Sequence, residues 1–280
     1  MRRGFTLFAA FAAGCLMAAG TATAQTPIKT GIDATFAPHA MPKLGGGLEG
    51  FNIDLANELA KRMGRPIEIE GTEFSALIPG MNAKKYDFLI APTTVTPERA
   101  KAMLFTEGYM ETDYMFLQKK SDKPIASLED LKGKKVAVNK GSAYESWTRQ
   151  NAEKYGFTFD VYGTNADAVQ AVLSGRADTN MAGHTVVMWA AKNNPTLAPT
   201  YTYKTGLVWA MPFRIDDKAG RDQVSMVLTC MKKDGTVARL YEKWFGIKPA
   251  ADSWVFKIAP GHGVPDMPGY DPGPYAVKCS

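Results

Sequence analysis

The sequence predicts an α/β fold with two lobes, because strand and helix signals alternate along the chain in two separate rounds. The first round runs from "IKTGI" at residue 28 to "YDFLIAP" at residue 92. The second round begins near residue 118 and has a similar length. Two rounds of similar size favour two lobes over one wide sheet.

The first round is predicted to be β-α-β-α-β. Strands are expected at "IKTGI" and "IEIEG", and the apolar run "YDFLIA" is typical of a strand buried in a parallel sheet. "SALIPGMNAKK" predicts a helix capped by Ser75. The other helix, "FNIDLANELAKRMG", ends in a glycine and carries its apolar residues on one face: Phe51, Leu55, Leu59 and Met63.

The second round repeats this alternation. "KKVAVNKG", "TFDVYG" and "ADTNMAG" are predicted as strands, and "SAYESWTRQNAEKYG" and "HTVVMWAAKNN" as helices. "NADAVQAVLSGR" is a further helix, with Asn165 as its expected cap. "YTYKTGLVWAMPFRI" then predicts one long β-type segment, and two more helices follow it. The last residues, 247–280, are rich in proline and glycine and predict an extended tail over the surface.

Residues 1–24 are predicted to be a signal peptide. Arg2 and Arg3 precede the apolar run "FTLFAAFAAGCLMAAG", and "ATA" before Gln25 is a small-residue cleavage site. The context for twin-arginine export is incomplete, so the general secretory route is favoured, and cleavage before Cys15 as a lipoprotein is a minor alternative. We therefore expect an exported, periplasmic protein.

Composition excludes several classes of function. The formal net charge is +5, and the lysines are scattered rather than clustered with aromatic residues, so nucleic acid is not an expected partner. The three histidines lack metal-ligand spacing, and we expect no metal or cofactor. Cys230 and Cys279 remain after cleavage, and an even pair in an oxidising compartment predicts a disulfide. The alternative is a buried Cys230 with a free Cys279.

The segment "APTTVTPERA" predicts an anion site. Thr96 is the expected N-cap of a short helix and Pro97 its first residue, which places Arg99 in the first turn. The N-terminus of a helix already carries partial positive charge, so a cation there is unfavourable unless an anion lies beside it. The simpler alternative is a surface arginine paired with Glu98.

Several segments occur in an order that identifies a family by resemblance. They are "GIDATFAPH", "GFNIDLANELAKRMG", "FSALIPGMNAKKYDFLIAPTTVTPER", "FTEGY", "SLEDLKGKKVAVNKGS", "LSGRAD" and "DGTVARLYEKWFG". Over about residues 28–246 the chain resembles periplasmic solute-binding proteins of polar amino-acid ABC transporters. The resemblance implies a periplasmic-binding-protein-like fold, with two α/β lobes joined by two hinge crossings and a ligand cleft between them. Lobe 1 is expected at 26–116 plus 208–246, lobe 2 at 117–207, and the tail, 247–280, on lobe 1.

The resemblance also implies a carboxylate anchor. Arg99 matches the arginine that forks onto the carboxylate of the ligand, which suits the planar guanidinium. Thr94 matches a residue that contributes its hydroxyl and N–H, and Pro92 one that contributes its carbonyl. Ser142 and Ala143 would present backbone N–H groups to the same carboxylate from lobe 2. Ala143 lacks the hydroxyl expected there, which weakens this anchor.

Other matched positions form the walls and the rim of the expected pocket. Phe36 and Phe74 match apolar residues that sandwich the ligand, with ordinary core packing as the alternative. Asp33 matches an acid at the rim that can serve cationic side chains, and a solvated loop acid is the alternative reading.

One expected residue is missing. In the family, an acid five positions after the aspartate of the "G-R-x-D" turn holds the α-amino group of the ligand. Counting from Asp178 gives Gly183, followed by His184. His184 could instead donate to an acidic or neutral ligand, or face solvent at the start of its helix. Either the ligand is not an ordinary α-amino acid, or its amine is held elsewhere, with three candidates: Asp33, Glu73 and the Pro92 carbonyl.

The function implied is that of a non-catalytic, monomeric receptor. It captures an amino acid or related small carboxylate and delivers it to an ABC-transporter permease in the inner membrane. The alternative is an enzyme on the same fold, similar to cyclohexadienyl dehydratases. Such an enzyme needs a general acid in the cleft, for which Glu145 and His184 are the only lobe 2 candidates.

Overall fold

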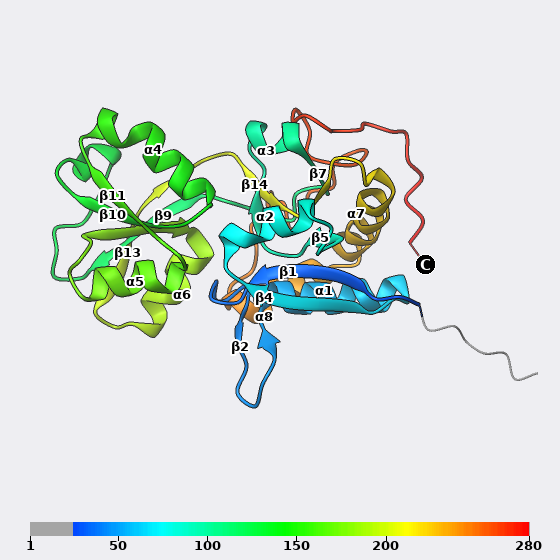
Figure 1. The fold of residues 1–280 in the computed structure, drawn as a ribbon, viewed down its shortest axis with the longest axis horizontal. Coiled ribbons are helices and arrows are strands. Elements are labelled where there is room, and N and C mark those ends of the chain that lie inside the picture. The colour runs from blue at the N-terminus through cyan, green and yellow to red at the C-terminus, as the bar shows by residue number, and fades with distance from the viewer. Residues whose placement is uncertain (1–24, 280) are drawn as a thin grey trace, which may run out of the picture.

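Two lobes, each built on its own sheet, lie side by side in the structure (Figure 1). This computed structural model describes residues 25–279, and the predicted signal peptide, residues 1–24, lies outside the described residues. One five-stranded sheet has the order β4-β1-β5-β15-β7 and the other the order β11-β10-β12-β9-β13. The predicted two-lobed α/β fold is confirmed. Among the described residues, no helix is both long and apolar enough to cross a bilayer.

The sheet of lobe 1 pairs β1 in parallel with β4 and β5, and β15 runs antiparallel to β5 and β7. Helices α1, α7 and α8 pack on one another beside this sheet (Figure 1). The strands are β1 (Ile28–Asp33), β4 (Ile67–Thr72), β5 (Phe88–Leu89), β7 (Met103–Phe105) and β15 (Pro212–Arg214). The helices are α1 (Phe51–Met63), α2 (Phe74–Asn82), α3 (Pro97–Ala102), α7 (Lys218–Lys233) and α8 (Thr236–Phe245).

In the sheet of lobe 2, β10 pairs in parallel with β11 and β12, and β9 runs antiparallel to β12 and β13. The strands are β9 (Tyr114–Lys119), β10 (Lys135–Asn139), β11 (Thr158–Tyr162), β12 (Thr179–Gly183) and β13 (Leu197–Tyr203). The helices are α4 (Ala143–Tyr155), α5 (Asn165–Leu173) and α6 (His184–Asn193), with a 3-10 turn, η1 (Leu128–Leu131). Strand β9 thus begins at Tyr114, before residue 117, where lobe 2 was expected to begin.

The predicted long β segment at 201–215 is wrong as a single element. Its residues belong to β13, to β14 (Val208–Ala210) and to β15, and these three strands lie in three different sheets. Gly206 has a φ of +70°, which turns the chain between β13 and β14. Strand β14 pairs with β6 (Thr93–Thr94) and β8 (Met110–Glu111) in a small sheet, and β2 (Met41–Pro42) and β3 (Leu48–Glu49) form a hairpin. The chain therefore leaves lobe 2 through β14 and re-enters lobe 1.

The structure confirms some of the predicted helix caps and contradicts others. Thr96 caps α3 as predicted, since its hydroxyl accepts a hydrogen bond from the Arg99 N–H. The predicted Ser75 cap is wrong, because α2 begins one residue earlier, at Phe74. The Asn165 cap is also wrong, because the Thr164 hydroxyl accepts the Asp167 N–H and makes Asn165 the first helical residue.

The C-terminal tail lies on lobe 1 (Figure 1). Its predicted disulfide, Cys230 to Cys279, is confirmed. The tail also completes a buried ion pair. The ammonium of Lys232 lies 3.1 Å from the Glu107 carboxylate and donates to the carbonyl of Lys257, a tail residue, at 2.8 Å. A buried ammonium needs acceptors for its donors, so the tail carbonyl is part of what keeps Lys232 stable in the interior.

Candidate functional site

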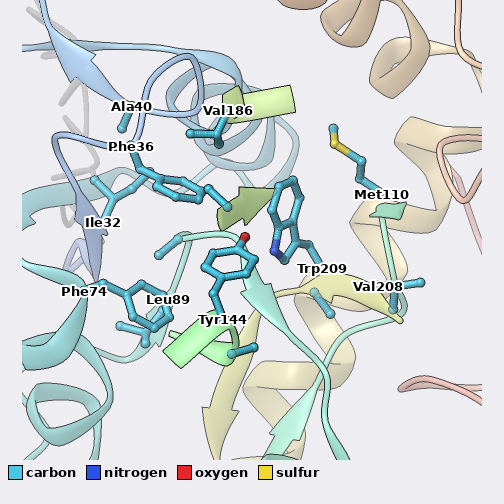
Figure 2. Close-up of a cluster of buried hydrophobic side chains, with 14 of the residues drawn as sticks. Ile32, Phe36, Ala40, Phe74, Leu89, Met110, Tyr144, Val186, Val208 and Trp209 are labelled. Atoms are coloured by element: carbon cyan, nitrogen blue, oxygen red, sulfur yellow. The ribbon is translucent and has the colours of Figure 1, made fainter. Parts of the chain in front are cut away.

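A cavity between the lobes gathers seven of the residues proposed for ligand binding. It lies where the N-terminus of α4 meets the turn before α3, beside the loop that follows β1. Figure 2 shows Phe36, Phe74, Tyr144 and Trp209 around this region. The proposed residues that line it are Phe36, Phe74, Pro92, Thr94, Arg99, Ser142 and Ala143, and the lining is completed by Asn139, Tyr144 and Trp209.

Arg99 connects the two lobes at this cavity. Its guanidinium donates one hydrogen bond to the Thr94 carbonyl in lobe 1, at 3.0 Å, and another to the Gly141 carbonyl in lobe 2, at 2.9 Å. The same group lies over the ring of Phe74, 5.6 Å from the ring centroid. The planar fork is therefore held between both lobes by neutral acceptors.

The charge of Arg99 has no acidic counterpart in the part of the chain that the structure describes, since no carboxylate oxygen lies within 4.0 Å of it. The alternative pairing with Glu98 is not formed. The Glu98 carboxylate instead accepts hydrogen bonds from its own backbone and from Thr96, and these lower its pKa. Burial lowers the pKa of Arg99, because the desolvated cation is disfavoured. An anion in the cavity would offset that cost.

The N-terminus of α4 adds a second positive feature. The Ser142 hydroxyl caps the helix by accepting the Glu145 N–H at 3.1 Å, and it donates to the Asn139 carbonyl at 2.5 Å. Ala143 is the first helical residue and lines the cavity. The first N–H groups of a helix and its dipole favour an anion. Arg99 and α4 thus present positive charge to the cavity from opposite lobes.

Gly183 is explained by a close approach of Trp209. A Cβ atom at Gly183 would lie 2.6 Å from two carbon atoms of the Trp209 indole and 3.0 Å from the Tyr144 hydroxyl. Side chains do not tolerate such contacts, so only glycine fits here. The indole therefore occupies the space into which a side chain at position 183 would project. Figure 2 shows the Tyr144 hydroxyl pointing between Phe36 and Trp209.

Sequence reasoning missed Trp209 and Tyr144. The signal that could have led to them was the glycine itself, because a missing side chain at a matched position calls for another group to fill the space. Together the aromatic side chains leave a cavity of only about 10 Å³, roughly the room that one water requires. The lobes are closed, and the site is filled by its own side chains.

Asp33, proposed at the pocket rim, is buried instead, with 1% of its surface exposed. One carboxylate oxygen accepts the N–H and the hydroxyl of Thr35, and the other accepts the Asn139 amide nitrogen at 3.2 Å. Burial raises the pKa of Asp33. Because a carboxylate only accepts, the amide nitrogen of Asn139 faces Asp33, and its oxygen is left buried without a partner among the described residues. Asn139 lines the cavity, so it can offer an acceptor to a ligand.

The other acids and the histidine proposed for the site do not line the Arg99 cavity. His184 begins α6 and lines two neighbouring cavities. The Glu145 carboxylate accepts the Gly141 N–H at 2.7 Å and pairs with Arg149 at 2.6 Å. Glu73 is exposed, and its carboxylate lies opposite Gly163 of lobe 2.

Away from the hinge crossings, hydrogen bonds between described residues join the lobes directly across the cleft. Besides the bonds from Arg99 to Gly141 and from Asn139 to Asp33, the imidazole of His39 bridges the lobes. One ring nitrogen lies 2.9 Å from the Asn52 amide oxygen in lobe 1, and the other lies 2.8 Å from the Thr185 hydroxyl in lobe 2. His39 is fully buried, and burial lowers its pKa from 6.5 to about 3. It is therefore neutral at pH 7.

The low pKa of His39 predicts a loss of stability on mild acidification. Between pH 6.5 and about 3, the unfolded chain binds a proton at this residue that the folded chain does not bind. Stability is therefore lost as the pH falls through this window, by up to about 1.4 kcal/mol per pH unit. Urea unfolding at pH 7 and pH 5 should show a loss of roughly 2 kcal/mol in wild type and a smaller loss in His39→Gln, which cannot titrate. Equal losses in both proteins would contradict the assignment.

Comparisons with known proteins give one consistent result. The model of the family described as bacterial extracellular solute-binding proteins, family 3, matches residues 28–247. The arginine-binding extracellular protein ArtP of Bacillus subtilis is 31% identical over 231 residues, which cover 81% of this chain and 89% of that protein.

Solved structures agree with this result. The structure of an ancestral arginine-binding protein bound to arginine has a TM-score of 0.76 and 34% identity, and the match covers 80% of this chain and 100% of that one. The ancestral amino acid-binding protein AncCDT-1, a precursor of cyclohexadienyl dehydratase, has a TM-score of 0.70 and 33% identity, covering 78% and 95% of the two chains.

Proposed function

This chain belongs to family 3 of the bacterial extracellular solute-binding proteins, and from its cavity we propose that it captures a small carboxylate without a free α-amine. The carboxylate ligand enters between the lobes and is delivered to the permease of an ABC importer. The observation that carries the proposal is the cationic Arg99 fork. Its guanidinium faces the N-terminus of α4, and it has no acidic partner in the described part of the chain.

The carboxylate requirement follows from the charge of the site. Arg99 donates to two neutral carbonyls, which do not neutralise the cation. A ligand carboxylate placed between Arg99 and the N–H groups of Ser142 and Ala143 would accept charge-assisted hydrogen bonds from both lobes. Because these donors come from opposite lobes, the ligand binds the closed form more tightly than the open form and shifts the equilibrium towards closure.

The preference against a free α-amine follows from Gly183 and Trp209. An ammonium in a closed cleft needs a counter-charge, and at position 183 the space for such a side chain is occupied by the indole. The Asn139 oxygen offers one neutral acceptor to the cavity, which suits an amide N–H or a hydroxyl better than an ammonium. Asp33 is already committed to Thr35 and Asn139.

The free volume of the site requires the aromatic side chains to move when the ligand binds. A cavity of about 10 Å³ cannot hold a carboxylic acid, so the lobes open and Trp209 or Tyr144 changes its rotamer before closure. The hydrogen bonds of His39, Asn139 and Arg99 across the lobes stabilise the closed arrangement.

A thermal-shift screen tests the proposal. It compares L-α-amino acids with their deaminated and N-acylated analogues, which share the carboxylate and the side chain. A ligand present at a hundred times its dissociation constant should stabilise the protein by about 2.7 kcal/mol. We expect shifts with the deaminated or N-acylated series and little effect of the amino acids. Submicromolar binding of an unmodified L-amino acid would overturn the preference.

A double variant provides the matched control for the screen. Trp209→Ala with Gly183→Asp removes the indole and supplies an acid in the vacated space, so this protein should gain affinity for free amino acids. Trp209→Ala alone makes room without adding a charge and should not gain it. If both proteins bind amino acids equally well, the indole and not the missing acid determines the preference.

A cyclohexadienyl-dehydratase-like activity is the second candidate, favoured by the similarity to AncCDT-1. It requires a general acid beside the substrate. Glu145 and His184, the lobe 2 residues considered for this role, do not line the Arg99 cavity in the closed form. Turnover of a cyclohexadienyl substrate, lost in Glu145→Gln or His184→Gln, would favour the enzyme over the receptor.

A further inference from the structure

A second cavity, of about 310 Å³, lies between the lobes and shares no lining residue with the Arg99 cavity. Its lobe 1 wall comes from α8 and the residues after it, including Tyr241, Trp244 and Ile247. Its lobe 2 wall comes from α6, including Met188 and Trp189. Pockets of this size are typical of small-molecule sites. This cavity offers far more room between the lobes than the cavity beside Arg99.

The ring of His39 separates the two cavities. On one side it lies 4.8 Å from the Trp209 ring and 5.7 Å from the Phe36 ring, both of which line the Arg99 cavity. On the other side it lies 5.5 Å from the ring of Phe245, which lines the second cavity. His39 is also hydrogen-bonded across the lobes to Thr185. The partition is therefore buried and held in place, and the two cavities are separate sites.

The walls of the second cavity favour a flat apolar group. Trp189, Tyr241, Trp244 and Phe245 supply aromatic surfaces from both lobes. The Trp244 indole N–H donates to the Asp54 carboxylate at 2.7 Å, which fixes the orientation of that wall. Met188 and Ile247, at the cavity, are 51% and 61% exposed. An occupant that covers this apolar surface gains stabilisation from its burial.

The charge of the second cavity favours an anion. Lys192 on α6 is exposed and lines it, and its ammonium makes no ion pair or hydrogen bond within residues 25–279. Within the described part of the chain, no aspartate or glutamate lines this cavity, but Glu111, Asp113 and Asp252 line the adjoining cavity that shares His184 and Tyr241, so an anion is favoured at the Lys192 end. His184 also lines it, and one of its ring nitrogens is buried without a partner among the described residues. Such a nitrogen is costly, and a polar group of an occupant that reaches the ring would reduce that cost.

From these observations we propose that the second cavity is a binding site for a small aromatic carboxylate. The ring lies between the α6 and α8 walls, and the carboxylate faces Lys192 at the rim. Both lobes contribute to the site, so its ligand would stabilise the closed form and would be coupled through lobe closure to a ligand on Arg99.

Calorimetric titration with indole-3-acetate tests this site, and tryptamine, which carries an ammonium on the same ring system, is the matched counter-probe. We expect indole-3-acetate to bind and tryptamine to bind at least tenfold more weakly. Lys192→Glu and Met188→Glu change exposed residues and should each weaken indole-3-acetate at least tenfold. Lys120→Glu, which changes an exposed lysine of lobe 2 outside the cavity, should stay within twofold of wild type.

Three results would overturn the proposal. The first is the absence of indole-3-acetate binding at millimolar concentration, and the second is equal binding of tryptamine. The third is binding that Lys192→Glu leaves unchanged and Arg99→Ala abolishes, which would place the compound in the Arg99 cavity. Only the third would also support the function proposed for Arg99, so the two proposals can fail separately.

Discussion

Replacing Arg99 with alanine is expected to weaken binding of the carboxylate found in the analogue screen by at least about a hundredfold, or roughly 3 kcal/mol. The variant removes both donors of the fork and, among the described residues, the only cation that lines the Arg99 cavity. The fold should persist, because the guanidinium lies at the lobe boundary, where both its hydrogen bonds go to backbone carbonyls. Isothermal titration calorimetry measures the change directly.

Two controls define the role of Arg99. Arg99→Lys keeps the charge but loses the planar fork, so its affinity should fall between those of wild type and Arg99→Ala. Lys101→Ala removes an exposed cation from the same helix, and we expect near wild-type affinity for it. Near wild-type affinity of Arg99→Ala would refute the carboxylate anchor.

Loss of the Cys230–Cys279 disulfide is expected to destabilise the protein by about 4 kcal/mol in the chain-entropy model. The bond joins residues 49 positions apart and ties the tail to α7. For a chain of this size, such a loss lowers the melting temperature by roughly 8–16 °C. Differential scanning calorimetry of Cys279→Ser, and of the wild type with and without reductant, should show the same shift.

Lys278, an exposed residue next to Cys279, is the control position. Lys278→Ala leaves the bond intact and should change the melting temperature little. Two free thiols in protein purified from the periplasm would contradict the disulfide. A shift of less than about 2 °C on reduction would show that the tail remains docked without it.

Local patterns in the sequence predicted most of the elements, because those elements depend on neighbours in the chain. The Thr96 cap and Pro97 predict the start of α3, and the apolar face of α1 follows from its period. The errors at Ser75 and Asn165 have the same origin. Several nearby residues can cap a helix, and the geometry of the turn selects one of them.

The order of the motifs placed Arg99, Thr94, Ser142 and Ala143 in one site, and the structure brings these residues together around one cavity. The sequence also showed that a side chain is missing at Gly183. It could not show what lies there instead, because Trp209 reaches Gly183 only after the chain has returned from lobe 2 to lobe 1 through β14.

By itself, the sequence determined the two α/β rounds, the family motifs and the position of Arg99 in the first turn of α3, since these depend on local spacing and residue type. Only the tertiary structure decided the contents of the cleft. The contact of Trp209 with Gly183, the burial of Asp33 against Asn139 and the bridge from His39 to Thr185 each join residues distant in the sequence. Such contacts depend on how the two lobes close on each other, and no periodicity along the chain encodes that closure.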